Sequence, residues 1–327
     1  MLRAAHDVGV AEWPQPQPGP RDVVIRVRAC GICGTDRHIV EGAYPSAKPN
    51  VLGHEFAGTV EQLGGEVSCL AFGDRVAVDP NIACGFCAAC RRGDVHLCER
   101  LQAIGVTLPG GMAPFVRVPE LQAHKIPPNL SLDAAAFAEP LSCIVHGLER
   151  VRLPLGARVA VLGAGSIGLM MLQALRSSGA AWISVSEPAA PKRELAAFFG
   201  ADEALEPVQF DAPSHESAYD LVVDCTGVPA MLNTALRLGR RGADILLFGV
   251  SPMGKTTAIE PYVLYRKEQR IVASNINPHT MDKAIALLAN AEVRVDHIVS
   301  REVALDELPA LLSTPAAADE IKAALRF

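Results

Sequence analysis

The 327-residue chain lacks the features by which membrane, secreted and nucleic-acid-binding proteins are usually recognised. No stretch of it approaches the length of about 20 apolar residues that a helix needs to span a bilayer. The first residues, MLRAAHDVGVAEWPQP, contain no apolar run long enough for a secretory signal peptide. The net charge of −6 argues against a phosphate-backbone partner, which requires a basic surface. We therefore expect a cytoplasmic protein that binds neither membrane nor nucleic acid.

The chain also lacks internal repeats, low-complexity tracts and blocks of like charge. A hydrophobic fraction of 50% and a charged fraction of 20% are typical of a globular protein. One hydrophobic core rarely extends over this length, so two domains are expected. Nine cysteines are present, and clustered cysteines in a reducing compartment bind metal or do chemistry.

Four of the cysteines follow the spacing Cys-x2-Cys-x2-Cys-x7-Cys, at Cys84, Cys87, Cys90 and Cys98. Four thiolates complete the tetrahedral coordination that zinc prefers and leave no position for a substrate. In a ferredoxin-type iron–sulfur motif the fourth cysteine follows after three residues and precedes a proline, whereas Cys98 follows after seven residues and precedes Glu99. Disulfide bonds are disfavoured in a reducing compartment. The spacing therefore predicts a structural zinc in a lobe at about residues 81–100.

The hydrophobic pattern differs between the two halves of the chain. In VVIRVRA the apolar residues alternate with Arg26 and Arg28, which indicates a half-buried strand, and the first 130 residues are β-rich. Ser131 can cap a following helix. After Gly156 the apolar runs RVAVLG, WISVSE, DLVVDC and ADILLFG show no alternation and are separated by helical stretches. Such runs are typical of a parallel sheet covered by helices on both faces, so an α/β protein is predicted.

A glycine-rich loop, GAGSIG at 163–168, follows the first of these apolar runs and opens an apolar helix. Glu187 ends the next run, and this order of strand, loop, helix and acidic residue is the dinucleotide-binding fingerprint. A carboxylate there binds the ribose hydroxyls and repels a 2′-phosphate, which favours NAD. Two basic residues just downstream, Lys192 and Arg193, could instead bind a 2′-phosphate, so NADP remains an alternative cofactor. The alternative interpretation is a plain turn before a helix.

Four residues in three separate segments have side chains that can bind zinc: Cys33 in CGICGTDRH, His54 and Glu55 in VLGHEF, and Glu139 in FAEPLS. A catalytic zinc needs three protein ligands and one open position. The residue types alone leave such a site open, because each residue has a simpler interpretation. Cys33 could form a redox pair with Cys30, His54 could be a hydrogen-bonded core histidine, and Glu139 could mark a helix boundary.

The motifs CGICGTDRH, GHEFAGTV, GDRVAV, the four-cysteine lobe, EPLS and GAGSIG follow one another in this order over the whole chain. Together they resemble the zinc-dependent medium-chain alcohol dehydrogenases, in particular the sorbitol (polyol) dehydrogenase branch. The resemblance implies a GroES-like β-rich catalytic domain at 1–144, a Rossmann doubly wound NAD-binding domain at 145–275, and a C-terminal return to the catalytic domain at 276–327. It also implies two zinc ions per chain, one catalytic and one structural, and a homo-oligomer, either a tetramer or a dimer.

The resemblance further implies roles for individual residues. The cysteine, histidine and first glutamate of the dispersed set match the catalytic zinc ligands, and Glu139 matches a glutamate that binds the metal directly or through water. Thr35 resembles the hydroxyl residue that takes the alcohol proton, and His38 the histidine that passes a proton to solvent. Asp36 is expected to orient the ligands. The implied cofactor-binding residues are Gly163, Gly165, Ile167, Gly168, Glu187, Lys192, Phe248, Gly249, Val250, Ser274 and Asn275.

The chain departs from the sorbitol branch where substrate contacts are made. Sorbitol dehydrogenases carry His-Tyr where His38 is followed by Ile39, and an Arg-Tyr pair where this chain has Ser274 and Asn275. We predict a zinc-containing, NAD-dependent alcohol/polyol dehydrogenase (EC 1.1.1.-) that transfers a hydride from a secondary alcohol, a small polyol or sugar alcohol, and gives a ketone or ketose. A threonine-type amino-alcohol dehydrogenase and an NAD(H)-binding protein without turnover are the alternatives.

Overall fold

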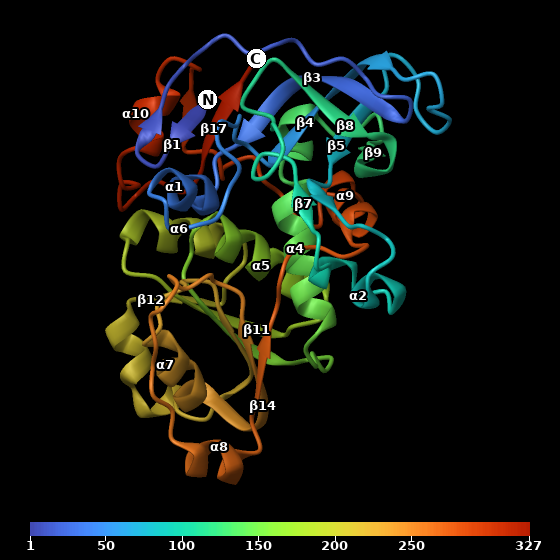
Figure 1. The fold of residues 1–327 in the computed structure, drawn as a ribbon. Helices are drawn as coiled ribbons and strands as arrows, with labels where there is room; N and C mark the ends of the chain where they lie inside the picture. Colours follow the sequence, from blue (N-terminus) through green and yellow to red (C-terminus); the bar gives the residue numbers. More distant parts are fainter. The chain divides into compact units, whose positions relative to one another are not determined.

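The computed structural model describes all residues, 1–327, and the chain divides into two compact units (Figure 1). The first unit contains the stretches Met1–Ser142, Asn277–Ala291 and Val299–Phe327. The second contains the stretches Cys143–Ile276 and Glu292–Ile298.

Residues 292–298 belong to the second unit, whereas the sequence analysis assigned the whole of 276–327 to the first. The contacts of helix α5 (Ser166–Ser177) explain the difference. The side-chain amide of Gln173 donates to the carbonyl of Arg294 at 3.0 Å and accepts the N–H of Arg294 at 2.8 Å. The guanidinium of Arg294 lies 5.1 Å from the ring centroid of Phe198. These contacts attach the segment to helices of the second unit.

The first unit is built on a seven-stranded sheet with the order β16-β17-β3-β4-β5-β9, in which β8 also pairs with β3. Neighbouring strands are antiparallel except for β16 and β17, which are parallel. In β3 Val27 is buried while Arg26 and Arg28 are exposed, as the alternation predicted. The strands of this sheet are β3 (Asp22–Gly31), β4 (Glu55–Leu63), β5 (Arg75–Val78), β8 (Phe115–Pro119), β9 (Ala123–Lys125), β16 (Arg301–Val303) and β17 (Ala323–Arg326).

Short elements complete the first unit. Ser131 caps α3, because its hydroxyl accepts the N–H of Ala134 at 3.1 Å. The remaining strands pair in twos and are β1 (Leu2–Ala4), β2 (Asp7–Val8), β6 (Asn81–Ile82) and β7 (Gln102–Ala103). The helices are α1 (Gly34–Val40), α2 (Ala88–Arg91), η1 (Val95–Leu97), η2 (Glu120–Gln122), α3 (Leu132–Ala135), α9 (Met281–Ala289) and α10 (Leu308–Leu312).

The second unit contains a six-stranded, wholly parallel sheet with the order β12-β11-β10-β13-β14-β15. The four apolar runs without alternation form four of its six strands, β10, β11, β13 and β14, so the predicted α/β class is confirmed. Its strands are β10 (Arg158–Leu162), β11 (Trp182–Ser186), β12 (Glu203–Leu205), β13 (Tyr219–Asp224), β14 (Gly239–Leu247) and β15 (Arg270–Ala273). Its helices are α5, α6 (Ala190–Phe198), η3 (Pro207–Asp211), η4 (Pro213–His215), α7 (Met231–Leu238) and α8 (Pro261–Lys267).

Helix α4 (Ala138–Glu149) passes from the first unit into the second after Ser142. None of the helices combines the length and the apolar character needed to cross a membrane. The C-terminal sequence IKAALRF, which the pattern predicted to be a strand, contains β17 and pairs antiparallel with β3. This long-range pairing brings the last residues of the chain beside the strand that leads into α1.

Candidate metal and cofactor sites

The four cysteines of the lobe converge as their spacing predicted. The Sγ–Sγ distances are 3.5 Å for Cys87 and Cys90, 3.9 Å for Cys84 and Cys90, and 4.0 Å for Cys87 and Cys98. Four sulfurs placed 2.3 Å from a tetrahedral zinc would be separated by about 3.8 Å. A disulfide would need a sulfur–sulfur distance of about 2.05 Å, and all four thiols are free. The cluster therefore fits a structural zinc.

Backbone N–H groups point at the sulfurs of this cluster. Those of Cys84 and Arg100 each donate to the sulfur of Cys98 at 3.3 Å. The N–H of Cys90 donates to Cys87 and is the main cause that lowers the pKa of Cys87 to about 6. The thiolate is the form of cysteine that binds a metal. The lobe is thus arranged to stabilise negative charge on sulfur.

Cys33, His54 and Glu55 meet at a second place in the first unit. Cys33 is the N-cap of α1, His54 directly precedes β4, and Glu55 is the first residue of β4. Their ligand atoms all lie within 4.8 Å of one another. One thiolate, one imidazole and one carboxylate are the ligand number and chemistry of a catalytic zinc with an open position. The structure groups these three residues, and Glu139 is not among those whose ligand atoms converge to this distance.

The redox alternative for Cys33 does not suit the environment of Cys30. The side chain of Cys30 is fully buried in the core of the first unit, and both thiols are free. Burial raises the pKa of the Cys30 thiol well above its usual value. A redox-active pair needs an accessible, readily ionised thiol, so Cys30 is a packing residue.

Asp36 contacts two residues of the three-ligand cluster. One carboxylate oxygen accepts the N–H of Cys33 at 2.8 Å, and the other lies 3.5 Å from Nδ1 of His54. Burial lowers the pKa of His54, but Asp36 and Cys33 outweigh burial and raise it well above its ordinary value. A site whose negative field attracts a proton this strongly also attracts a metal cation. The donor set and its field therefore fit zinc.

Lys322 is a member of the site that the motifs did not indicate. It directly precedes β17, and its ammonium group forms an ion pair with Glu55. Both side chains are buried, with 5% and 2% exposure. The one signal in the sequence was a lysine in the otherwise apolar start of IKAALRF. Nothing in that signal specified the partner.

The residues with implied proton-transfer roles lie on two helices. Thr35 and His38 are half-buried on α1. Glu139 is buried in the first turn of α4. Burial raises the pKa of Glu139 to about 7, and the nearby carboxylates Glu55 and Asp79 act in the same direction. A carboxyl group of this kind can hold or release a proton near neutral pH.

The glycine-rich loop follows β10 and leads into α5. Gly163 has a φ of +95°, a conformation that glycine adopts without strain. A Cβ on Gly168 would collide with the carbonyl of Gly163, so the helix can approach the strand only with glycine there. Gly165 is the N-cap of α5, and Ile167 lies in its first turn. The loop therefore has the backbone geometry that the fingerprint predicted.

Glu187 follows β11 with its carboxylate fixed against the backbone. One oxygen accepts the N–H of Ala164 at 2.8 Å, and the other accepts the N–H of Ala189 at 3.0 Å. Arg193 is already engaged, because it donates to the carbonyl of Glu187 at 2.9 Å and to the carboxylate of Glu206 at 3.0 Å.

The remaining implied cofactor residues lie at the same edge of the parallel sheet. Carboxyl ends of parallel strands meet at one edge, where open α/β sheets bind their ligands. Lys192 is half-buried on α6. The residues that follow β14 are Phe248, Gly249 and Val250, and those that follow β15 are Ser274 and Asn275.

Comparison with known proteins gives two family matches and several relatives. The description "Alcohol dehydrogenase GroES-like domain" matches residues 19–128, and "Zinc-binding dehydrogenase" matches residues 166–290. D-arabinitol dehydrogenase 1 of Uromyces fabae is 33% identical, with 93% of this chain and 90% of the relative covered. L-threonine 3-dehydrogenase of Caldanaerobacter subterraneus is 36% identical, with 72% and 70% covered. A zinc-binding dehydrogenase of Sinorhizobium meliloti 1021, solved bound to NADP, is 39% identical with a TM-score of 0.97, and 100% of this chain and 98% of that chain are covered.

Proposed function

The chain belongs to the zinc-binding medium-chain alcohol dehydrogenase family, and on that premise we propose that it oxidises a secondary alcohol of a small polyol with NAD as hydride acceptor. It is a zinc-type, NAD(P)-dependent alcohol or polyol dehydrogenase. One observation carries the proposal: Cys33 comes from one segment, the adjacent residues His54 and Glu55 come from another, and their ligand atoms lie within 4.8 Å of one another.

We assign the catalytic zinc to these three residues. Bound there, zinc supplies Lewis-acid chemistry toward a substrate hydroxyl. Asp36 orients two of the ligands through its contacts with Cys33 and His54. Thr35 takes the hydroxyl proton and His38 passes it toward solvent. Glu139 holds a proton or an additional negative charge close to the ligands, as its pKa of about 7 allows.

We propose NAD rather than NADP because of Glu187. Its carboxylate is held in place by two backbone N–H groups and is therefore directed where the ribose of a dinucleotide would bind. A 2′-phosphate would meet this negative charge. The nearest arginine, Arg193, is occupied with Glu206 and with the backbone of Glu187. The Sinorhizobium relative was solved with NADP, which makes the cofactor preference a sharp test.

A polyol is favoured as the substrate over an amino alcohol. The relative named for arabinitol covers 93% of this chain, and the relative named for threonine covers 72%. Ile39, Ser274 and Asn275 replace the tyrosines and the arginine of sorbitol dehydrogenases. Because these replacements remove donors that reach hydroxyl groups, we expect a polyol other than sorbitol.

A substrate panel tests the proposal. The purified chain is assayed with D-arabinitol, other pentitols and hexitols, 2,3-butanediol and L-threonine, each with NAD and with NADP, and Cys33→Ala serves as the inactive control. The highest kcat/KM is expected for a pentitol or hexitol with NAD. A preference for L-threonine would establish the amino-alcohol alternative, and NADH binding without turnover on any alcohol would establish a protein that has lost activity.

The compartment and the assembly are proposed on separate grounds. All nine cysteines are free, which supports a reducing, cytoplasmic location. The homo-oligomer implied by the resemblance stays a prediction, and light scattering on the purified protein checks it.

A further inference from the structure

The ion pair between Lys322 and Glu55 is the most deeply buried lysine–carboxylate contact at the candidate metal site. The two side chains are 5% and 2% exposed. A buried charge is costly unless it is paired, so each group depends on the other. Glu55 is also one of the three residues whose ligand atoms converge with those of Cys33 and His54. The carboxylate of Glu55 therefore contacts an ammonium group and is also a candidate metal ligand.

Strand β3 lies between the two members of the pair, and a glycine makes their contact possible. Gly31 pairs with Glu55 of β4 on one side and with Ala324 of β17 on the other. A Cβ on Gly31 would collide with Oε2 of Glu55, the oxygen that Lys322 contacts, and would lie 3.0 Å from Cε of Lys322. Any side chain at position 31 would thus displace the Glu55 carboxylate and crowd the lysine, and the pair could not form as it does. The space over Gly31 is the path by which Lys322 reaches Glu55.

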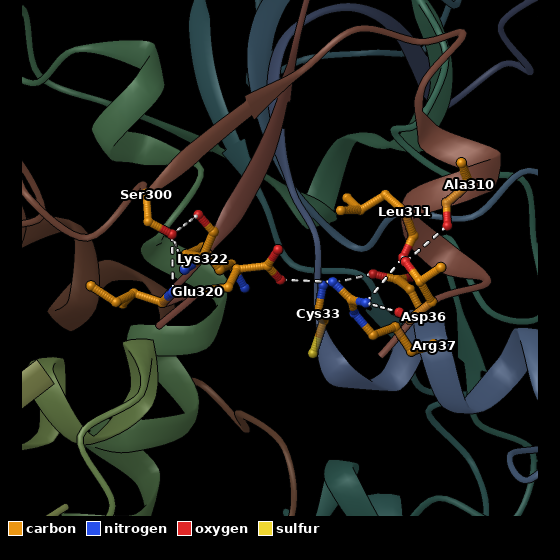
Figure 2. Close-up of polar contacts among 10 residues, drawn as sticks. Cys33, Asp36, Arg37, Ser300, Ala310, Leu311, Glu320 and Lys322 are labelled. Carbon is orange, nitrogen blue, oxygen red and sulfur yellow. Dashed lines mark hydrogen bonds and ion pairs between the residues drawn. The ribbon is translucent and has the colours of Figure 1, made fainter. Parts of the chain in front are cut away.

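The backbone of Lys322 is fixed by Ser300, the residue that directly precedes β16. The hydroxyl of Ser300 accepts the N–H of Ile321 at 2.9 Å and that of Lys322 at 3.3 Å. The N–H of Ser300 donates to the carbonyl of Lys322 at 2.9 Å. Figure 2 shows Ser300 and Lys322 joined in this way. The ammonium group is therefore presented from a rigid position.

The same stretch also holds the helix that follows Cys33. Glu320 forms an ion pair with Arg37 of α1 at 2.7 Å, and both side chains are largely buried (Figure 2). Arg37 donates in addition to the carbonyl of Leu311 at 3.0 Å. Residues 320–322 thus contact both elements that carry metal-ligand candidates, α1 and β4.

We propose that Lys322 is a positioning residue of the catalytic metal site: its ammonium group holds one carboxylate oxygen of Glu55, leaves the other for the metal, and offsets one negative charge of the ligand set. This inference rests on the zinc assignment made above. The thiolate of Cys33 and the carboxylate of Glu55 alone would cancel the charge of a zinc ion. The buried carboxylate of Asp36 adds a further negative charge, which the ammonium group of Lys322 offsets. The site therefore carries no net negative charge that would oppose the one developing on an alcohol oxygen during oxidation.

The experiment compares Lys322→Met, which keeps the chain length and removes the charge, with Lys322→Arg, which keeps the charge. Lys125→Met is the matched control, because Lys125 forms an exposed ion pair with Asp74 in the same unit. Zinc per chain, the rate of zinc loss to a chelator, the visible spectrum of the cobalt(II)-substituted protein and the melting temperature are measured on each, together with kcat and KM for the best polyol.

Lys322→Met is expected to retain two zinc ions, to shift the cobalt bands because Glu55 loses the group that holds one of its oxygens, and to lower kcat by about 10- to 100-fold. Lys322→Arg should give a cobalt spectrum and a kcat close to those of the wild type. Lys125→Met should leave the zinc content, the cobalt spectrum and kcat unchanged. A cobalt spectrum of Lys322→Met equal to that of the wild type, or an unchanged kcat, would overturn the proposal.

Two features of the design keep the outcomes separate. Should Lys322→Met fail to fold, Lys322→Gln keeps an N–H donor at this position and removes the charge, and it should shift the cobalt bands in the same direction; an unshifted spectrum then counts against the proposal. The metal measurements need no substrate. A wild-type protein that oxidises no alcohol would refute the proposed function alone, and an active wild type with an insensitive Lys322→Met would refute this inference alone.

Discussion

One carboxylate oxygen of Asp36 lies 3.5 Å from Nδ1 of His54, and the two side chains are 0% and 10% exposed. The other oxygen of Asp36 accepts the N–H of Cys33. A single carboxylate therefore contacts the residue at the start of α1 and the residue that precedes β4. Partners of this kind orient metal ligands and are often nearly as important as the ligands themselves.

Replacing Asp36 tests that relationship. Asp36→Asn keeps the shape of the side chain and removes its charge, so the imidazole of His54 loses the group that orients it. We expect a 10- to 100-fold loss of affinity for the catalytic zinc or of kcat. Chelator competition on the variant measures the affinity for the catalytic zinc, and the zinc of the four-cysteine site serves as an internal reference. Wild-type affinity and wild-type kcat together would mean that Asp36 only packs against the site.

The two zinc sites should be separable by mutation. Cys33→Ala removes one ligand of the open set and should take away one zinc and the activity while the melting temperature changes little. Cys90→Ala opens the closed tetrathiolate cluster and should mainly lower stability, because a structural zinc contributes directly to folding. Elemental analysis gives the zinc content of both variants, and thermal unfolding gives their melting temperatures. Unfolding of Cys33→Ala together with a stable Cys90→Ala would reverse the two assignments.

Glu139 should be needed for chemistry more than for metal retention. Its ligand atoms are not part of the cluster formed by Cys33, His54 and Glu55, and burial raises its pKa to about 7. Glu139→Gln keeps the volume and removes the proton that titrates, so kcat should fall substantially while zinc content stays near two per chain. Both quantities are measured on one preparation. Parallel loss of zinc and activity would make Glu139 an obligatory ligand.

Glu187 should set the cofactor preference. Its carboxylate is fixed by the N–H groups of Ala164 and Ala189, and contact with a 2′-phosphate would juxtapose two negative charges. Such a contact costs several kcal/mol, enough for a preference for NAD of about 100-fold in kcat/KM. Glu187→Ala should narrow the difference in kcat/KM between NAD and NADP. Lys192→Ala is measured alongside it for comparison. Equal or better kcat/KM with NADP in the wild type would contradict the assignment.

Much of the architecture follows from short-range sequence signals. The four cysteines of the lobe lie within fifteen positions, so their spacing alone brings the sulfurs together, and the glycine loop is placed by the strand that it ends and the helix that it begins. The four apolar runs without alternation specified a parallel sheet, because strands covered on both faces need apolar side chains on both faces. The alternation around Arg26 and Arg28 specified a strand with one exposed face for the same reason.

The catalytic cluster depended on tertiary structure. Cys33, His54 and Glu55 belong to segments that become neighbours only when β3 pairs with β4, and the sequence left that meeting open until the order of the motifs was compared with a family. Lys322 entered the site because the last strand, β17, pairs with β3 across nearly the whole length of the chain, and the assignment of 292–298 to the second unit depended on contacts with Gln173. Local patterns determine which element a segment forms, whereas the pairing of distant segments determines which side chains share a site, and in this protein the residues proposed for chemistry belong to the second kind.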